Sequence, residues 1–155
     1  MNSVEKVKYL IENNVFMVIA TADSTGKPWI SPVGFTYDDS YNLYWVSYKE
    51  ALHSKNIISR PEVAITIFGQ MPDKSYDGVY IDATATELDN EAEIQIAIDE
   101  FAKRSQDSKF TVESIADVTD NAAWRMYKAV SVHISKRADD TINGQAITIR
   151  EPVEF

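Results

Sequence analysis

The sequence predicts an α+β protein that is mainly β, in which an antiparallel sheet closes into a small barrel with helices at its periphery. Two observations carry this prediction. Short β-rich segments separated by turn residues follow one another along most of the chain. Apolar residues at helical spacing occur before the first segment, in one short insertion and in a longer excursion. The chain has 155 residues, the size of one domain, so residues 1–155 are expected to form a single unit.

A helix and a hairpin are predicted first. The helix is indicated by apolar residues at helical spacing, Val4, Val7, Leu10 and Ile11. It is expected to end at Asn13-Asn14, because Val15–Thr21 is an apolar, β-rich run typical of a strand covered on both faces. The turn residues Asp23–Gly26 follow, so Pro28–Tyr37 is expected to pair antiparallel with that run. The interior proline, Pro32, donates no backbone hydrogen bond and predicts an edge strand or a local bulge.

Later strands are predicted over residues 42–48, 63–68, 79–86, 124–135 and 145–149. Apolar and polar residues alternate in the segment 79–86, which predicts a strand exposed on one face. The polar residues Asp139–Gly144 are expected to form the turn between the last two strands. Six or so short strands of this kind commonly close into a small barrel.

Two helices are predicted between the strands 79–86 and 124–135. Asn90 and Glu93 have the spacing of a capping box, and the helix that they open extends to about residue 103. Its apolar residues recur at i, i+4 and i+7, at Ile94, Ile98 and Phe101. Phe110-Thr111, with Ile115 positioned to meet the phenyl ring, predicts the start of a second, shorter helix.

The charge is negative and regional. The 24 acidic and 15 basic residues give a net charge of −9, of which −7 lies between Glu87 and Asp120. A field of that sign repels phosphate backbones and anionic membranes, so neither nucleic acid nor membrane is an expected partner. The chain has no cysteine, which excludes thiolate catalysis and zinc–sulfur sites. No stretch has the length of a membrane span or the pattern of a secretion signal, and a cytoplasmic location is expected.

The segment Lys49–Arg60 is the one locally basic stretch, and it contains His53, Ser54 and Lys55. A helix N-terminus beside a hydroxyl, an imidazole and a lysine is a typical phosphate site, because the helix dipole and the side chains attract the same anion. The stretch equally fits a solvated amphipathic helix that buries Leu52, Ile57 and Ile58. Both interpretations stay open on these residues alone.

Hydrolytic and metal chemistry have little support. His53 and His133 are distant in sequence and neither has a carboxylate at a ligand spacing, so no metal site is predicted. Ser31, Ser47 and Ser54 lack the glycine pattern of a nucleophile elbow. Aromatic residues gather on the second and third predicted strands, at Trp29, Phe35, Tyr37, Tyr44, Trp45 and Tyr48. They fit either core and subunit packing or the walls of a site for a planar ligand.

The order and spacing of several segments resemble the pyridoxamine 5'-phosphate oxidase-like family of FMN-binding split β-barrels. The segments are Ile19–Thr21, Gly26–Pro28, Pro32–Phe35, Leu43–Ser47, His53–Ile57 and Arg60–Ala64. The resemblance covers about residues 4 to 70 well and Trp124–Ser135 loosely. It implies a six-stranded antiparallel split barrel that forms a homodimer, with FMN bound where the two subunits meet.

The resemblance also implies which residues contact the flavin. The second strand would face the isoalloxazine ring with Ser31, Val33 and Gly34. The third would lie along the ribityl chain with Val46 and Ser47. His53, Ser54 and Lys55 would then hold the phosphate. The family's oxidase usually has arginine at the position of Ser31 and an Arg-Lys pair at Leu52 and His53, and its C-terminal Arg-x-His signature is absent here.

Two classes of function follow. The first is an FMN-dependent oxidoreductase with an unassigned small-molecule substrate and NAD(P)H as a possible donor. Because the flavin carries the redox chemistry, the absence of an acid–base dyad is expected. The second is a non-catalytic flavin- or haem-binding dimer that acts as a stress-response or interaction module through the acidic segment 87–120, with His53 or His133 on any haem.

Overall fold

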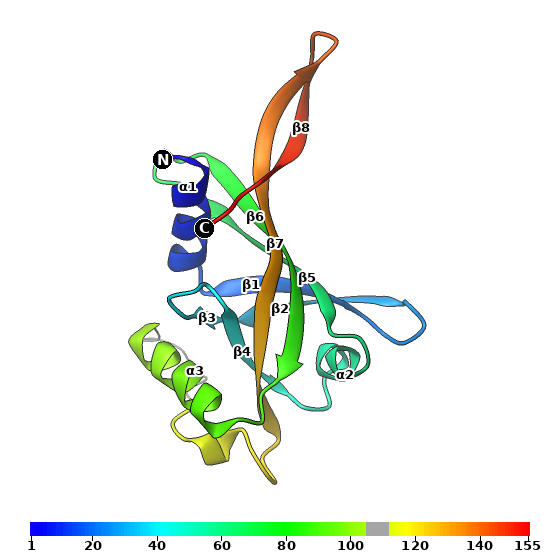
Figure 1. Ribbon diagram of the computed structural model, residues 1–155, viewed down its shortest axis with the longest axis vertical. Helices are drawn as coiled ribbons and strands as arrows, with labels where there is room; N and C mark the ends of the chain where they lie inside the picture. The colour runs from blue at the N-terminus through cyan, green and yellow to red at the C-terminus, as the bar shows by residue number, and fades with distance from the viewer. Residues whose placement is uncertain (105–111) are drawn as a thin grey trace.

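The computed structural model describes residues 1–104 and 112–155 and contains one antiparallel sheet with peripheral helices (Figure 1). In these residues the strands are β1 (Phe16–Ala22), β2 (Pro28–Gly34), β3 (Thr36–Tyr37), β4 (Leu43–Tyr48), β5 (Glu62–Gln70), β6 (Tyr76–Glu87), β7 (Trp124–Ile142) and β8 (Gln145–Pro152). The helices are α1 (Ser3–Asn13), α2 (Leu52–Ser59), α3 (Glu91–Arg104) and the 3₁₀ turn η1 (Ile115–Asp117).

The sheet curls because its two edges are consecutive in the chain. The strand order is β2-β1-β5-β6-β7-β4-β3, so β2 and β3 form opposite edges, and only Phe35 separates them. β2 also contacts β4 across the gap. The predicted antiparallel barrel is thus confirmed. The strand number differs from six, because the segment 28–37 breaks at Phe35 and β8 pairs β7 off the path that closes the barrel.

The hairpin between β1 and β2 forms as predicted. Its loop is closed by the Asp23 carboxylate, which accepts hydrogen bonds from the backbone amides of Thr25 and Lys27. Gly26 has a φ of 91°, which only glycine adopts at little cost. β2 pairs with β1 alone, and this edge position tolerates the missing amide hydrogen of Pro32.

β1 is covered on one face only, which corrects the prediction for Val15–Thr21. Met17, Ile19 and Thr21 are buried, whereas the side chain of Phe16 is 65% exposed. The inward side chains meet the barrel core, and the described chain places no helix over the outward ones. An apolar run therefore indicated a strand correctly but did not identify what covers it.

The barrel has two apolar cores. The larger fills the barrel and receives Leu10 and Ile11 from α1, whose N-terminus is closed by an Asn2–Glu5 capping box. The smaller lies under α3, which begins after Asn90 as predicted. η1 follows Ser114, while the predicted start at Phe110-Thr111 lies outside the described residues.

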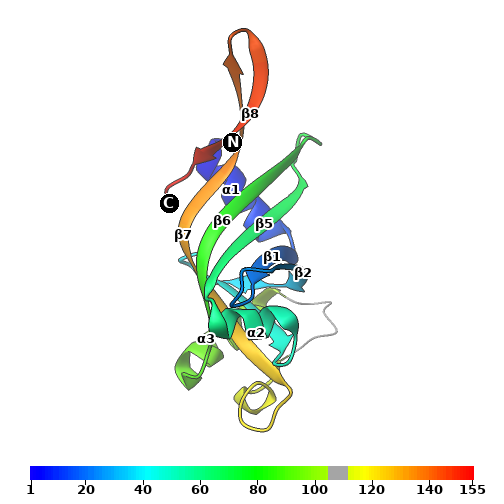
Figure 2. The same cartoon turned by 90° about the vertical axis from the view of Figure 1, so that its right-hand side faces the viewer.

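The last two strands form a hairpin that projects from the barrel (Figure 2). β7 extends to Ile142, so the turn is confined to Asn143 and Gly144 instead of spanning Asp139–Gly144. Asn143 and Gly144 both have positive φ, at 52° and 78°, as a two-residue hairpin turn requires. The polar residues Asp139 and Asp140 lie in the strand, where their side chains are exposed.

Candidate functional site

One end of the barrel brings together the elements that the sequence singled out. α2 follows β4 directly and packs against β1 and β2, and β2 in turn contacts β4. The start of α2 therefore lies next to the end of β4, and β2 contacts both of these elements. We call this place the barrel mouth, formed by residues 29–34, 46–48 and 51–56.

Two predicted residues are joined directly at the barrel mouth. The Ser47 hydroxyl and His53 Nε2 are 2.8 Å apart, and they come from the end of β4 and the first turn of α2. Ser47 is buried and His53 half-buried. Burial lowers the pKa of His53 below its ordinary value of 6.5, so the imidazole is neutral at pH 7.

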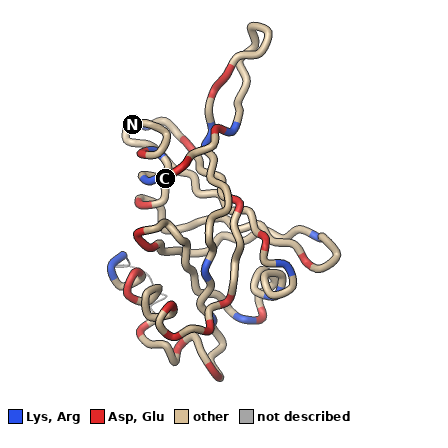
Figure 3. Tube along the Cα trace, viewed as in Figure 1, with Lys and Arg blue, Asp and Glu red and all other residues tan. Residues whose placement is uncertain are grey.

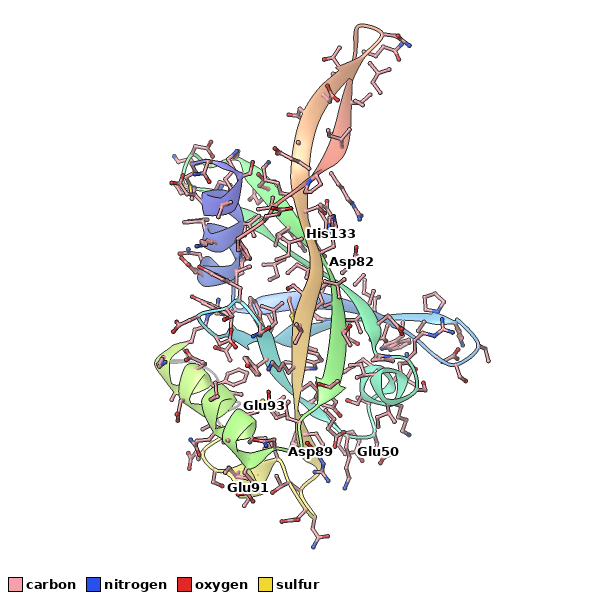
Figure 4. All side chains as sticks on the ribbon, viewed as in Figure 1. Glu50, Asp82, Asp89, Glu91, Glu93 and His133 are labelled. Atoms are coloured by element: carbon pink, nitrogen blue, oxygen red, sulfur yellow. The ribbon has the colours of Figure 1, made fainter. Side chains whose placement is uncertain are left out.

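The other two residues predicted for phosphate binding are engaged elsewhere. Ser54 is fully buried, and its hydroxyl donates to the backbone carbonyl of Tyr48 at 2.9 Å. The Lys55 ammonium lies 2.9 Å from a carboxylate oxygen of Glu50, beside α2 (Figure 4). This hydrogen bond and charge lower the pKa of Glu50. The Lys55 side chain is half exposed, whereas the Ser54 hydroxyl is buried and bonded at the start of α2.

α2 is anchored by a residue that sequence reasoning did not assign a role. The Asn56 side-chain amide donates to the Thr21 hydroxyl at 3.0 Å, and both residues are buried. This bond fixes α2 on β1. At the other end of the helix the N-cap residue is Ala51, which has no side-chain acceptor. The Lys55 amide donates to the Ala51 carbonyl, and the amides of the three helical residues before it have no intrahelical acceptor, as at the start of any α-helix.

The predicted flavin-contacting residues of β2 and β4 divide between two faces. On β2, Ser31 and Val33 share the inner face, where Ser31 accepts a hydrogen bond from Trp29 Nε1 at 3.0 Å and Val33 is buried in the barrel core. Ser47 points into the barrel and its neighbour Val46 packs toward the core under α3. A ligand at the mouth therefore meets the side chain of Ser47 but only the backbone near Val46. A Cβ added at Gly34 would be 3.8 Å from the nearest backbone oxygen, an ordinary contact.

β7 contributes polar groups near the mouth that were not predicted. Arg125 is in register with Ser47, and its Nε lies 3.3 Å from a carboxylate oxygen of Glu87. The Tyr127 hydroxyl donates to the same carboxylate group at 3.2 Å, and burial raises the pKa of Tyr127 to about 12. Only the basic and aromatic run at the start of this strand signals them in the sequence.

Charge is distributed unevenly over the fold (Figure 3). Acidic residues dominate α3 and its surroundings, although Glu93 is paired with Lys128 at 2.8 Å. Both signs of charge occur around α2. Within residues 1–104 and 112–155 no cluster of His, Asp or Glu has the arrangement of a metal site. No helix of the described residues has the length and apolar character needed to cross a bilayer.

The chain belongs to the pyridoxamine 5'-phosphate oxidase family. The family's sequence pattern matches residues 3–133, which include the whole barrel mouth. No curated protein matches the chain at a significant level. Membership defines the class of protein, a split barrel of this family, and it agrees with the resemblance found in residues 4 to 70.

Solved structures with this fold have different ligands in their names. The heme storage protein HutZ from Vibrio cholerae is 17% identical, with a TM-score of 0.66 over 84% of this chain and 91% of that one. A FAD-binding protein from Mesorhizobium loti is 16% identical, with a TM-score of 0.66 over 88% and 94%. A heme binding protein from Mycobacterium smegmatis is 14% identical, with a TM-score of 0.68 over 97% and 59%. At these identities the likeness establishes the fold alone.

Proposed function

We propose that this protein binds FMN at the barrel mouth as a homodimer and is a flavin-dependent oxidoreductase that acts on a small molecule. The observation that carries the proposal is the half-buried Ser47–His53 pair beside the uncapped N-terminus of α2. A phosphate group suits this place, because amide donors, the helix dipole and an imidazole converge there. Membership of the pyridoxamine 5'-phosphate oxidase family supports the choice of a flavin.

The residues at the barrel mouth suit the phosphate of FMN, and most of them would bind it as neutral hydrogen-bond donors instead of as positive charges. His53 uses Nε2 toward Ser47, which leaves Nδ1 for a ligand. With a proton on Nδ1, the neutral ring donates a hydrogen bond to phosphate, while Ser47 donates to Nε2 and holds that tautomer. Lys55 adds a positive charge once it releases Glu50. Ser54 acts through its backbone amide, because its hydroxyl is bound to Tyr48.

The edge of β2 suits the ring system of the flavin. β2 is an edge strand, with β1 as its neighbour on one edge. The backbone groups of residues 31–34 that point to the other edge are therefore not used in sheet pairing. Amides on such an edge can donate to the polar rim of a planar ring. Bound flavin supplies electron transfer between a nicotinamide donor and the substrate, so the chain itself needs to bind, orient and exclude water.

The homodimer is proposed from the outer face of the sheet. We define the outer sheet face by the exposed apolar side chains Phe16, Ile30, Phe68 and Val130, which the strand register places on the same side. Several large apolar side chains exposed on one face, with no cover in the described chain, are typical of a subunit interface. A second copy packed on this face completes the burial of β1 that its apolar sequence predicted.

Absorbance and titration test the proposed function. The purified protein, or the protein after addition of FMN, is expected to absorb near 450 nm (about the maximum of oxidised flavin) and to bind one FMN per chain. His53→Ala should weaken FMN binding, whereas Lys103→Ala, a matched surface change on α3, should not. Absence of FMN binding would contradict the proposal. Binding without oxidation of NADH or NADPH would instead identify the non-catalytic flavin module.

Haem binding is a second candidate, favoured by one pair of residues. His133 on β7 is exposed and in register with Asp82 on β6, so the two side chains lie next to each other (Figure 4). A carboxylate beside an imidazole is a common way to orient a metal-ligating histidine. Titration with hemin would then give a Soret band that His133→Ala abolishes and His53→Ala leaves unchanged. The absence of a Soret band would exclude this candidate.

A further inference from the structure

The hairpin that β7 and β8 form beyond the sheet ends in a turn made of Asn143 and Gly144. The pairing of β7 with β6 ends at Lys136, which places the turn about 20 Å farther along the strand. Figures 1 and 2 both show the hairpin projecting away from the body. Both turn residues are exposed, and solvent therefore reaches them from all sides of the tip.

The turn leaves two reactive groups without partners. The ladder between β7 and β8 ends with Ile142 opposite Gln145, so the Gly144 N–H takes no part in it. Among the described residues, none accepts a hydrogen bond from that N–H and none bonds the Asn143 carboxamide. A Cβ built at Gly144 would meet no atom within 4 Å, so the space beside its nitrogen is open. The Gly144 nitrogen and Asn143 Cγ are neighbours in the chain, and both are accessible.

These two groups can react with each other. When the Gly144 nitrogen attacks Asn143 Cγ, a C–N bond forms and closes a succinimide ring. The nitrogen gives up its proton, the bond from Cγ to the side-chain NH₂ breaks, and ammonia leaves with that proton. Water then opens the ring. Cleavage of the bond between the ring nitrogen and Cγ gives aspartate, whereas cleavage at the main-chain carbonyl gives isoaspartate, whose main chain runs through the former side chain.

The attack requires the backbone of the turn to move, because the turn holds both residues at positive φ. Two features make this movement easy. Gly144 has no Cβ and changes its backbone angles at little cost. The strands of the hairpin pair only with each other beyond Lys136, and a two-stranded ribbon of this kind is marginally stable and opens at its end. The turn can therefore open while the barrel stays folded.

Asn143 differs in this respect from the other asparagines. The side chains of six of them are hydrogen-bonded: Asn2, Asn13, Asn14, Asn42, Asn56 and Asn90. Asn121 is exposed, but the amide that follows it, that of Ala122, donates to the Thr119 carbonyl at 2.9 Å. The Cβ of Ala122 also hinders the approach of that nitrogen. Asn121 is therefore a comparison site within the same chain.

We propose that Asn143 is a modification site that deamidates spontaneously in the folded protein, through a succinimide formed with Gly144 and with water as the only co-reactant. The product has one more negative charge, in a chain whose net charge is already −9. Isoaspartate also adds a methylene to the main chain of a two-residue turn, so that product loses the pairing of Ile142 with Gln145. The inference rests neither on FMN nor on the homodimer.

Peptide mapping of the folded protein during storage at neutral pH tests the site. Trypsin releases Asn143 in the peptide 138–150 and Asn121 in the peptide 110–125. The first peptide should gain the mass of one NH₂ replaced by OH at least about tenfold faster than the second, because only glycine leaves the attacking nitrogen unhindered. An isoaspartate-specific methyltransferase should label the first peptide. Equal rates in the two peptides, or no mass change at Asn143, would overturn the proposal.

Two variants separate the turn from the rest of the chain. Asn143→Gly removes the carboxamide and keeps a turn sequence that favours positive φ, so the mass gain should disappear. A gain that persists in this variant would place the reaction at another residue and overturn the proposal.

Asn56→Ala weakens the anchor of α2 and leaves the hairpin unchanged. Because the turn opens locally, the rate at Asn143 should stay within about twofold of the wild-type rate. A rate that rises in step with the population of unfolded chain would assign the reaction to the unfolded state, and the proposal would fail.

Discussion

The buried hydrogen bond between Asn56 and Thr21 provides the most direct test of how the barrel mouth is held. Asn56→Ala removes the donor from α2, and Thr21→Val removes the acceptor from β1 while keeping its volume. Asn56 is 7% exposed and Thr21 4% exposed, so water replaces the lost partner poorly in either variant. Each single change leaves one buried polar group unsatisfied, which costs about 1–3 kcal/mol of the free energy of unfolding.

The double variant separates this bond from general packing loss. With both groups removed, neither is left unsatisfied, so the double change should cost about 1–2 kcal/mol less than the sum of the single changes. Urea denaturation followed by tryptophan fluorescence measures all the values, since Trp45 is fully buried in the barrel. Lys103→Ala on the exposed surface of α3 is the control and should change stability by less than about 0.5 kcal/mol.

Additivity would refute the reasoning. If the loss of unfolding free energy in the double variant equals the sum of the losses in the single variants within about 0.3–0.5 kcal/mol, Asn56 and Thr21 are not coupled.

The same variants also report on function. FMN affinity should fall in Asn56→Ala, because a loosened α2 no longer holds His53 against Ser47. Unchanged FMN affinity in a variant of reduced stability would show that the barrel mouth does not depend on this anchor.

Further predictions concern charge. Burial lowers the pKa of His53 below 6.5, so the unfolded chain binds more protons there and stability should fall as the pH drops from 6.5 toward the folded pKa. Thermal melts of His53→Gln should show a smaller fall over that range. Arg104 donates to the carbonyls of Ile11 and Asn14 and stacks on Phe35, so Arg104→Met should cost about 2–3 kcal/mol in urea denaturation. Lys55→Ala should weaken FMN binding by about 1.5–3 kcal/mol in calorimetric titration, and Glu50→Gln should strengthen it by freeing the ammonium.

Each of these predictions has a contrary result. A pH profile of His53→Gln that matches the wild type would assign the acid sensitivity to other groups. An Arg104→Met variant as stable as the wild type would mean that the guanidinium contacts add nothing to the docking of α3. If Lys55→Ala and Glu50→Gln change FMN affinity in the same direction, the Lys55–Glu50 pair does not compete with the phosphate.

Local signals predicted most of the secondary structure. The capping residues Asn2 and Asn90, the Asp23–Gly26 turn and the alternation in β6 each depend on a few neighbouring residues, and each is present in the structure. The prediction was less accurate where local chemistry was ambiguous. Asp139 and Asp140 have turn-like composition, but the strand continues because two residues with positive φ suffice to reverse it.

The candidate site was predicted as a set of residues but not as an arrangement. The sequence placed His53, Ser54 and Lys55 together, and they do lie on one helical turn. It could not show that the Ser54 hydroxyl is hydrogen-bonded to the Tyr48 carbonyl or that Lys55 is paired with Glu50. These contacts depend on the position that α2 takes after β4 in the folded chain. Asn56 was overlooked because its partner, Thr21, is distant in the chain.

The sequence by itself determined the class of fold, since periodicity, caps and turn residues are properties of short segments. Tertiary structure alone decided which face of β1 is covered and that Ser47 meets His53. It also decided that β7 and β8 extend past the sheet. The physical reason is that the sheet curls and brings β2 into contact with β4. The partner and the exposure of each side chain are fixed only once the sheet has curled.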